Sequence, residues 1–436
     1  MQDQVYRTMT VLCRLVDEFP IGTNLGLVHL FWMMLSGQLL KTRGAVIPGL
    51  DALGLSEAAV RRGWAALGQG AWSTGELVTR WHGLAGKEQY WQPHVHGGFR
   101  PVAVDITGFP RPRLANCPTK HYDGNAGKAV PAIRLGLIVR VGQAGSQRLG
   151  IPTAIVRAPK TDHRLEAHVR ALVRQAVAGL AADEVAVFDR GFAVSMLQAE
   201  GCDRYVVRLT KNFTARRAVL PEYKGKGRRP KYGELVRPLA RRRQGRIYPA
   251  TPPDRSETWQ DGDLTLRADW WLDLVRPGAT PGSPTFHVVA IADPRFTEPL
   301  LLAVPLEVSG AVVRALYRDR WPVEQLPLAA KQMIGAHRQF VHAPETCQRL
   351  PELALVAGSV LSYLAAVLPA VPTGFWDRKP EPTAGRLRRV LAKADFPECA
   401  VLAPRIREKR SVTAHLPKGF WGQRPRSPAP MLAQVA

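Results

Sequence analysis

The sequence predicts an α/β fold, in which a mixed sheet is covered by helices and flanked by helical regions. Three observations predict it. Short runs rich in Val and Ile begin near residue 100 and are separated by Gly-containing or polar turns. Two stretches with helical periodicity alternate with further strand-length runs up to residue 210. Residues 1–96 and much of 307–371 carry apolar residues at helical spacing instead.

Residues 1–96 are expected to form a helical domain that binds DNA. Helical periodicity runs through VYRTMTVLCRLVDEF, LGLVHLFWMMLSGQLL and GLSEAAVRRGWAALG, and Ser56 is the expected N-cap of the third helix. Short helices joined by Gly-containing turns are compatible with a helix-turn-helix, in which Arg61, Arg62 and Trp64 would approach DNA. A helical bundle without DNA contacts explains the same pattern equally well.

Residues 97–210 are expected to form the first part of a core. The runs PVAVDIT, AIRLGLIVRV and RLGIPTAIVRA predict a three-stranded meander. A helix in HRLEAHVRALVRQAVAGLA, a strand in EVAVFDRGF, a short helix in AVSMLQAEG and a strand in RYVVRLT follow. This β-β-β-α-β-α-β order is the order of the ribonuclease H core.

The remaining chain divides into three regions. Residues 211–306 read as a β-rich basic insertion, with strands expected in LTLRADWWLDLVR, TFHVVAIAD and PLLLAVPL. Residues 307–371 return to helical periodicity and should complete the core, whereas residues 372–436 form a basic, Pro-rich and Arg-rich C-terminal region. Residues 353–371 lack charge and could span a bilayer by length, but Gly358, Ser359 and Pro369 favour a buried core helix. No membrane partner is expected.

The charge distribution points to a polyanionic partner. Lys and Arg number 60 against 36 Asp and Glu, a formal net charge of +24, which excludes a typical acidic metabolic enzyme. Residues 204–246 hold 15 basic and 2 acidic residues, and residues 373–428 hold 13 and 5. Two concentrated basic segments suggest phosphate-binding surfaces, with Arg241, Arg242 and Arg243 as candidate DNA contacts. Solvated basic loops are the alternative.

Cysteine and histidine usage indicates neither a disulfide framework nor a zinc ribbon. The five cysteines are odd in number and form no C-x-x-C pair. The first ten residues, MQDQVYRTMT, do not resemble a signal peptide, so the cytoplasm is the expected compartment. His94 and His96 have ligand-like spacing but no recognisable partner in the sequence, which favours a surface turn.

Three acidic residues are the candidates for catalysis. Asp105 in VAVDITG and Asp189 in VAVFDRGF each end an apolar strand at a Gly-containing turn, the sheet edge where sites form. If the two strands are neighbours, the carboxylates lie side by side and require a cation such as Mg²⁺. Glu324 is the third candidate. Tyr317, Arg320 and Lys331 share its helical face, within a sector of about 60°.

The pattern Y-x2-R-x3-E-x6-K, formed by Tyr317, Arg320, Glu324 and Lys331, resembles the Y-R-E-K signature of DDE transposases of the insertion-sequence-4 type. Asp189 in its D-R-G-aromatic context, the strand-end Asp105 and a long β insertion before the glutamate also match. The resemblance covers roughly residues 100–345.

The resemblance implies a cut-and-paste transposase. Asp105, Asp189 and Glu324 would hold two Mg²⁺ or Mn²⁺ ions for phosphoryl transfer on double-stranded DNA, at both transposon ends and target. Tyr317, Arg320 and Lys331 would bind phosphates of the transposon end, and the synaptic complex would contain a homodimer. Such families commonly cut through a DNA hairpin assisted by an aromatic side chain, for which the candidates are Trp259, Trp270, Trp271 and Trp321.

Two alternatives remain at this stage. One is a ribonuclease H-like nuclease without strand transfer, and the other is a catalytically silent DNA-binding protein derived from a transposase. The sequence also departs from an ideal helix around Glu324, because Pro322 and Pro327 flank it. Pro322 could instead begin a new helix, which would separate Tyr317 and Arg320 from the axis that carries Lys331.

Overall fold

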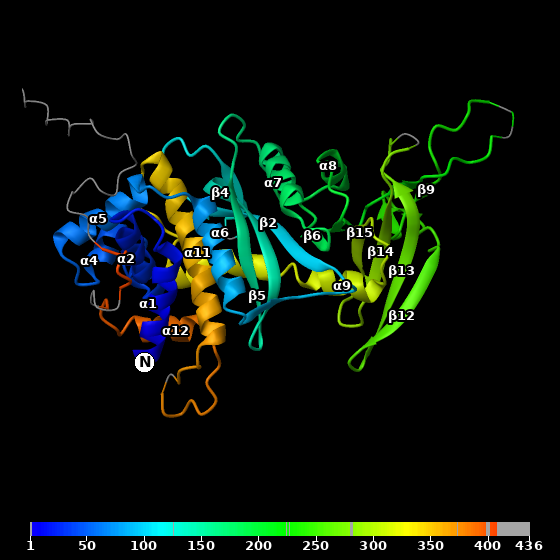
Figure 1. Ribbon diagram of the computed structural model, residues 1–436. Helices are drawn as coiled ribbons and strands as arrows, with labels where there is room; N and C mark the ends of the chain where they lie inside the picture. Colours follow the sequence, from blue (N-terminus) through cyan, green and yellow to red (C-terminus); the bar gives the residue numbers. More distant parts are fainter. Residues whose placement is uncertain are drawn as a thin grey trace, which may run out of the picture.

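A computed structural model describes residues 2–124, 126–223, 225, 227–279, 282–372, 374–397 and 402–407. Three regions lie side by side in Figure 1: a helical region, a central layer of strands with helices packed on it, and a region of long strands. Mixed α/β content with helical regions near both ends agrees with the predicted α/β class.

The helical region combines the N-terminal helices with two helices from the far end of the chain. Its elements are α1 (Gln2–Val16), α2 (Thr23–Leu35), α3 (Gln38–Lys41), α4 (Val46–Asp51), α5 (Glu57–Gln69), α6 (Thr74–Lys87), α11 (Pro344–Val367) and α12 (Ala384–Leu391). As predicted, Ser56 caps α5, where its hydroxyl accepts a hydrogen bond from the backbone N–H of Ala59. The expected all-helical stretch to residue 96 is wrong at its end, because β1 (Trp91–Pro93) pairs with a core strand.

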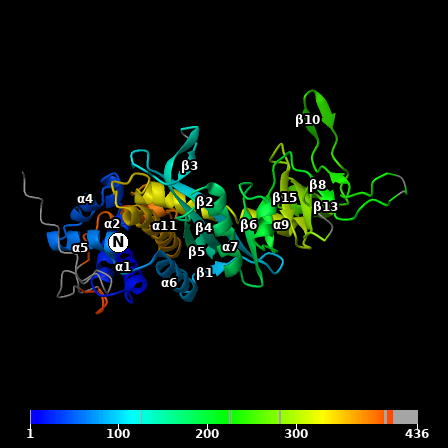
Figure 2. The same ribbon diagram turned by 90° about the horizontal axis from the view of Figure 1, so that it is seen from above.

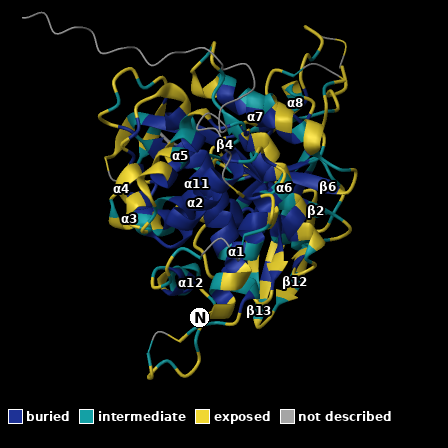
Figure 3. Cartoon of the chain, turned by 60° about the vertical axis from the view of Figure 1, so that its left-hand side comes forward, coloured by how far each residue is buried: buried dark blue, intermediate teal, exposed yellow. Residues whose placement is uncertain are grey.

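The apolar segment expected to be a core helix lies in α11. This helix is long and apolar enough to cross a bilayer, yet 83% of its most apolar window is buried inside the protein. Figure 3 shows α11 and α2 together in the buried interior. Side chains of both helices share one hydrophobic cluster with the central strands, so the helical region packs directly on the sheet.

The central layer contains the predicted strands and helices in the predicted order. They are β2 (Arg100–Pro110), β4 (Lys128–Ala144), β5 (Gln147–Arg157), α7 (Leu165–Gly179), β6 (Glu184–Phe188), α8 (Val194–Ala199) and β7 (Tyr205–Arg208). A short strand that was not predicted, β3 (Lys120–Asp123), forms a hairpin with β4. The spatial order is β5-β4-β2-β6-β7; β4 runs antiparallel to β2 and β5, whereas β2, β6 and β7 run parallel.

Successive residues of β2 point to opposite faces of this sheet, as strand geometry requires. Val102 and Val104 pack in the cluster that contains α7 residues. Ala103 and Phe109 pack in the cluster of the helical region. Odd-numbered positions of β2 therefore face the helical region, which decides the direction of any functional side chain there.

The insertion extends the central sheet. Its strands are β8 (Ala215–Arg217), β9 (Leu235–Val236), β12 (Arg255–Asp261), β13 (Leu264–Val275), β14 (Phe286–Ala292) and β15 (Leu300–Val304), and β15 pairs antiparallel with β7. Among the described residues this produces one sheet of 13 strands. Strand β12 was not predicted; it alternates exposed and half-buried residues and pairs with β13 along its whole length.

A separate hairpin of β10 (Arg241–Arg243) and β11 (Arg246–Tyr248) projects from the insertion in Figure 2. After β15 the chain returns to the central sheet through α9 (Gly310–Arg318), α10 (Pro322–Leu328) and a π-helical turn, Ala329–Ile334. Helix α9 packs on the opposite face of the sheet from α7, with Val313 and Leu316 against Val185 and Val187 of β6.

Candidate active site

The two aspartates lie side by side because β2 and β6 are parallel neighbours. Their register pairs Val104 with Phe188, so Asp105 and Asp189 are the next residues on the two strands. Strand β6 ends at Phe188, whereas β2 continues beyond Asp105 with β4 as its partner. The site therefore lies at the carboxyl end of the parallel pair, where a sheet leaves room for side chains.

The residues of the Y-R-E-K pattern come to this edge from four consecutive segments. Tyr317 lies in the last turn of α9, Arg320 lies in the turn that follows the helix, Glu324 lies in the first turn of α10, and Lys331 lies in the π-helical turn. The expected single stripe on one helix is therefore wrong. Pro322 is the reason: it occupies the first turn of α10, where its missing N–H costs nothing, and so begins a new helix.

The side chains nevertheless meet. Tyr317 donates a hydrogen bond to Asp189 Oδ1 over 3.1 Å. Arg320 bridges the other two acids, with Nη2 2.5 Å from Glu324 Oε1 and Nη1 3.8 Å from Asp105 Oδ2. Nη1 is buried and has no hydrogen-bond partner. One guanidinium thus links two of the three predicted carboxylates and leaves an unused donor beside them.

Lys331 also points to this site. Its Nζ donates a hydrogen bond to Thr107 Oγ1 over 3.1 Å and lies 5.2 Å from the centre of the Phe109 ring. Thr107 and Phe109 are odd-numbered residues of β2, on the same face as Asp105. Pro327 therefore does not turn Lys331 away into solvent. Burial lowers the pKa of Lys331, although the nearby charges of Asp123 and Asp105 oppose that shift.

Burial and neighbouring charges shift the pKa of Asp105. Burial, with smaller contributions from the negative charges of Glu324 and Asp189, raises the pKa of Asp105 to about 6. The backbone N–H of Ile106 and the Arg320 guanidinium oppose the shift. A further cation beside Asp105 would lower its pKa again, because a nearby positive charge stabilises the ionised carboxylate.

A basic cleft of about 700 Å³ opens beside these acids. Eight basic side chains line it, against two acidic ones: Arg148, Arg190, Arg208, Lys211, Arg295, Arg314, Arg318 and Arg320 against Asp293 and Glu298. Trp321 also lines it and is 56% exposed, whereas Trp270 and Trp271 are buried and Trp259 is partly buried in a hydrophobic cluster. Of the four tryptophan candidates, Trp321 alone combines exposure with a position in the cleft.

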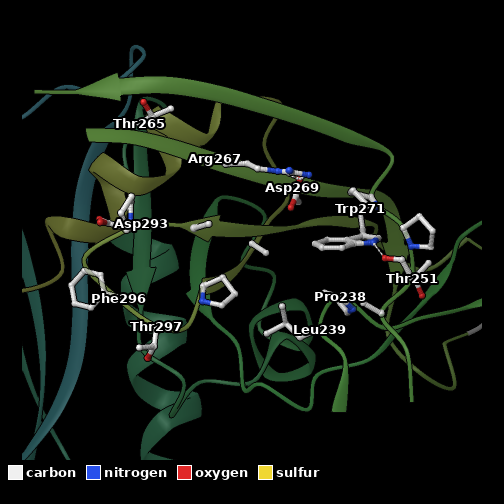
Figure 4. A pocket seen from close by; sticks show the side chains of 17 residues that line it. Pro238, Leu239, Thr251, Thr265, Arg267, Asp269, Trp271, Asp293, Phe296 and Thr297 are labelled. Carbon is white, nitrogen blue, oxygen red and sulfur yellow. Dashed lines mark hydrogen bonds and ion pairs between the residues drawn. The ribbon is translucent and has the colours of Figure 1, made fainter. Parts of the chain in front are cut away.

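A second cleft, of about 520 Å³, continues into the insertion. Figure 4 shows Thr265, Arg267, Asp269 and Trp271 along its wall, with Pro238 and Leu239 opposite and Phe296 and Thr297 at one end. Five residues line both clefts: Leu239, Asp293, Phe296, Thr297 and Pro299. The two hollows are therefore adjacent, and Tyr317 and Arg320 of the candidate site line the larger one.

The arginines predicted from the basic segment are not part of the acidic site. Arg241, Arg242 and Arg243 form strand β10 of the projecting hairpin (Figure 2). The Arg241 guanidinium lies 5.5 Å from the centre of the Tyr248 ring, and Arg242 is exposed. The side chain of Arg243 lies outside the part of the chain that the structure describes. Arg241 and Arg242 therefore belong to a basic surface on the hairpin.

Sequence reasoning missed one contributor to the site and one buried acid just outside it. Arg208 at the end of β7 lies 3.9 Å from Asp189 Oδ1, and its place at the end of a parallel strand was a usable signal. Asp319, between Tyr317 and Arg320 in the sequence, is buried and contacts His94 and His96. Comparison with protein-family models and with curated protein sequences finds no match for the chain.

Proposed function

We propose that this protein is a DNA transposase of the DDE type, which cleaves and joins DNA at the ends of a mobile element by cut-and-paste, as a homodimer. The observation that carries the proposal is the meeting of Asp105, Asp189 and Glu324 with Tyr317, Arg320 and Lys331. These residues come from β2, the end of β6 and the segment after β15, far apart in the sequence. If the Y-R-E-K residues were only a solvated helix face, nothing would bring them to the sheet edge that carries the two aspartates.

The strand order supports the finer fold that the proposal requires. In the order β5-β4-β2-β6-β7, three antiparallel strands lead into two that run parallel to β2. This order supports the proposed ribonuclease H-like core, in which the first and fourth strands would carry the first two acids. The insertion then lies between the second aspartate and the glutamate, as it does in the transposase family that the sequence resembles.

The donor set fits divalent metal ions. Three carboxylates are the hard oxygen ligands that Mg²⁺ and Mn²⁺ select. Among the described residues, their oxygens do not form a group within 4.8 Å of one another. The two ions shared among the three carboxylates are what the resemblance implies. When bound, such ions would supply an activated hydroxyl nucleophile and charge stabilisation for phosphoryl transfer.

The chain's own residues have defined tasks in this proposal. Tyr317 orients Asp189, Arg320 orients Glu324, and Lys331 presents an ammonium group beside Asp105 to a phosphate of the bound end. The basic cleft receives the DNA backbone, and the exposed Trp321 is placed to stack on an unpaired base.

The test uses DNA that flanks the gene as the candidate transposon end. Purified protein with Mg²⁺ should cleave this DNA at the element end, release the DNA outside the element, and join the new 3′ end of the element to a target plasmid. Cleavage without joining would favour the ribonuclease H-like nuclease, and binding without cleavage in Mg²⁺ or Mn²⁺ would favour the silent DNA-binding protein. The Asp189→Asn variant serves as the control for contaminating nucleases.

A further inference from the structure

Two histidines and one carboxylate form a cluster outside the candidate active site. His94 Nδ1 and His96 Nε2 lie 2.8 and 2.7 Å from the same atom, Asp319 Oδ2. These three atoms all lie within 4.8 Å of one another, and no other set of three such side chains in the described residues does so. The Asp319 side chain is 1% exposed, and the histidine side chains are 20% and 26% exposed.

The two histidines are held in place before any ligand arrives. Residues 94 and 96 are two positions apart on an extended segment, so their side chains point to the same face. The backbone N–H of His94 donates to the Val141 carbonyl of β4, and His96 pairs with Phe99 across a two-residue turn. Gly97 and Gly98 in that turn both have positive φ, 56° and 85°, which glycine adopts without strain.

The same segment fits closely against α9. A Cβ on Gly97 would lie 2.9 Å from Val312 Cγ2, near the start of the helix. Asp319, at the end of the same helix, meets the two imidazoles. The extended segment therefore runs along α9 and contacts it at both ends, which fixes the distance from the histidines to the carboxylate.

We propose that His94, His96 and Asp319 bind one divalent transition-metal ion of the zinc class. Two imidazole nitrogens and one carboxylate oxygen are a recurrent ligand set for Zn²⁺ and Fe²⁺, whereas Mg²⁺ and Ca²⁺ prefer oxygen ligands alone. Arg148 Nε lies 3.3 Å from Asp319 Oδ1, so it neutralises and orients the carboxylate from the side away from the histidines. The exposed side of the imidazoles leaves a fourth position for water.

The ion would stabilise the turn that carries the site residues. Asp319 lies between Tyr317 and Arg320, and the three acids are contacted by those two side chains. Metal bound at Asp319 would connect this turn to the extended segment of residues 94–96, more than 200 residues earlier in the chain. The binding itself does not depend on the proposed transposase function.

The experiment measures binding of Zn²⁺ and Co²⁺ to chelator-treated full-length protein in excess Mg²⁺. We expect one equivalent to bind, with visible Co²⁺ absorption bands that Zn²⁺ abolishes, and a rise in melting temperature on Zn²⁺ addition. His94→Asn and His96→Gln each keep an N–H donor near the position of the original nitrogen, so they preserve a hydrogen bond to Asp319 while removing a metal ligand. Each should lower Zn²⁺ affinity by at least about tenfold.

Two controls and one comparison decide the result. His342→Gln, a change at an exposed histidine, should leave Zn²⁺ affinity unchanged. Asp105→Asn should also bind Zn²⁺ normally, and loss of binding there would place the ion in the acidic site and overturn the proposal. Equal Zn²⁺ affinity in wild type, His94→Asn and His96→Gln would overturn it too, and would leave the cluster as a hydrogen-bonded connection only.

Discussion

At the residue scale, Asp105 is the side chain on which the candidate site depends most. It is flanked by two other acids and by Arg320, and its pKa is raised to about 6. We expect Asp105→Asn to reduce Mg²⁺-dependent cleavage at least about 100-fold while leaving DNA affinity unchanged, because it removes a ligand charge and little volume. Cleavage of end-labelled DNA and a binding titration measure the two effects. Loss of both together would indicate misfolding and contradict the assigned role.

Lys331 provides the second prediction at this scale. Lys331→Met keeps an unbranched apolar side chain of similar length and removes the ammonium group that lies over Phe109. We expect the Kd for gene-flanking DNA to rise about tenfold, a loss of about 1.4 kcal/mol, because one charge-assisted phosphate contact is lost. The Kd for random DNA should change less.

The matched control for Lys331 is Lys87→Met, a change at an exposed lysine of α6. Equal losses for the two variants on both DNA sequences would mean that Lys331 contributes only net charge. That outcome would favour a general nuclease over a transposase.

At the scale of elements, the β10–β11 hairpin is the basic surface that the sequence predicted and that the structure separates from the acids. The guanidinium groups of Arg237, Arg241 and Arg246 lie 5.3 to 5.7 Å from the Tyr248 ring. We expect replacement of Arg241, Arg242 and Arg243 by Gln to flatten the dependence of log Kd on log salt by roughly one unit per lost phosphate contact. An unchanged slope between low and moderate salt would identify the hairpin as a solvated surface.

A buried ion pair connects the helical region to the sheet. Glu352 of α11 is fully buried and accepts hydrogen bonds from Arg157 of β5 and Thr74 of α6. Glu352→Ala should lower the free energy of unfolding by about 2 to 3 kcal/mol, because it removes the fully buried acceptor of the Arg157 and Thr74 hydrogen bonds and leaves a cavity. Glu345→Ala removes the other partner of Arg157, whose side chain is 47% exposed, and should cost no more than about 1 kcal/mol.

Denaturant midpoints of the two variants test this difference. Equal effects would contradict it, since both residues pair with the same arginine and differ mainly in burial.

At the scale of the whole molecule, two buried histidines make stability depend on pH. Burial lowers the pKa of both His29 and His168 from 6.5 to about 4, with Arg62 and Arg134 as the respective nearby charges that also lower it. Between pH 4 and 6.5 the unfolded chain therefore binds more protons than the folded protein. Stability is complete above pH 6.5 and falls as pH decreases to 4, by up to about 3 kcal/mol for each histidine.

Urea unfolding at pH 4.5 and 6.5 measures this loss. The variant His168→Gln should show a smaller difference between the two pH values than the wild type. A difference that does not change on substitution would assign the acid sensitivity to other groups.

Local sequence determined the type and the approximate position of most elements. Alternating Val and Ile runs predicted β2, β4, β5, β6 and β7, and the position of Asp105 and Asp189 at the same edge followed from the expectation that β2 and β6 are neighbours. Strand and helix periods depend on neighbouring residues, so they are visible in the sequence. The motif spacing also predicted that Tyr317, Arg320, Glu324 and Lys331 lie together. It left open whether Pro322 begins a new helix.

Only the tertiary structure decided the contacts between distant segments. The pairing of β15 with β7, which joins the insertion to the central sheet, depends on strand edges that carry no local signal. The partner of His94 and His96 is Asp319, more than 200 residues later, and the exposure of Trp321 depends on what packs beside it. Such contacts arise when separate elements bury their apolar faces against one another, and the sequence pattern of one element does not specify which other element it will meet.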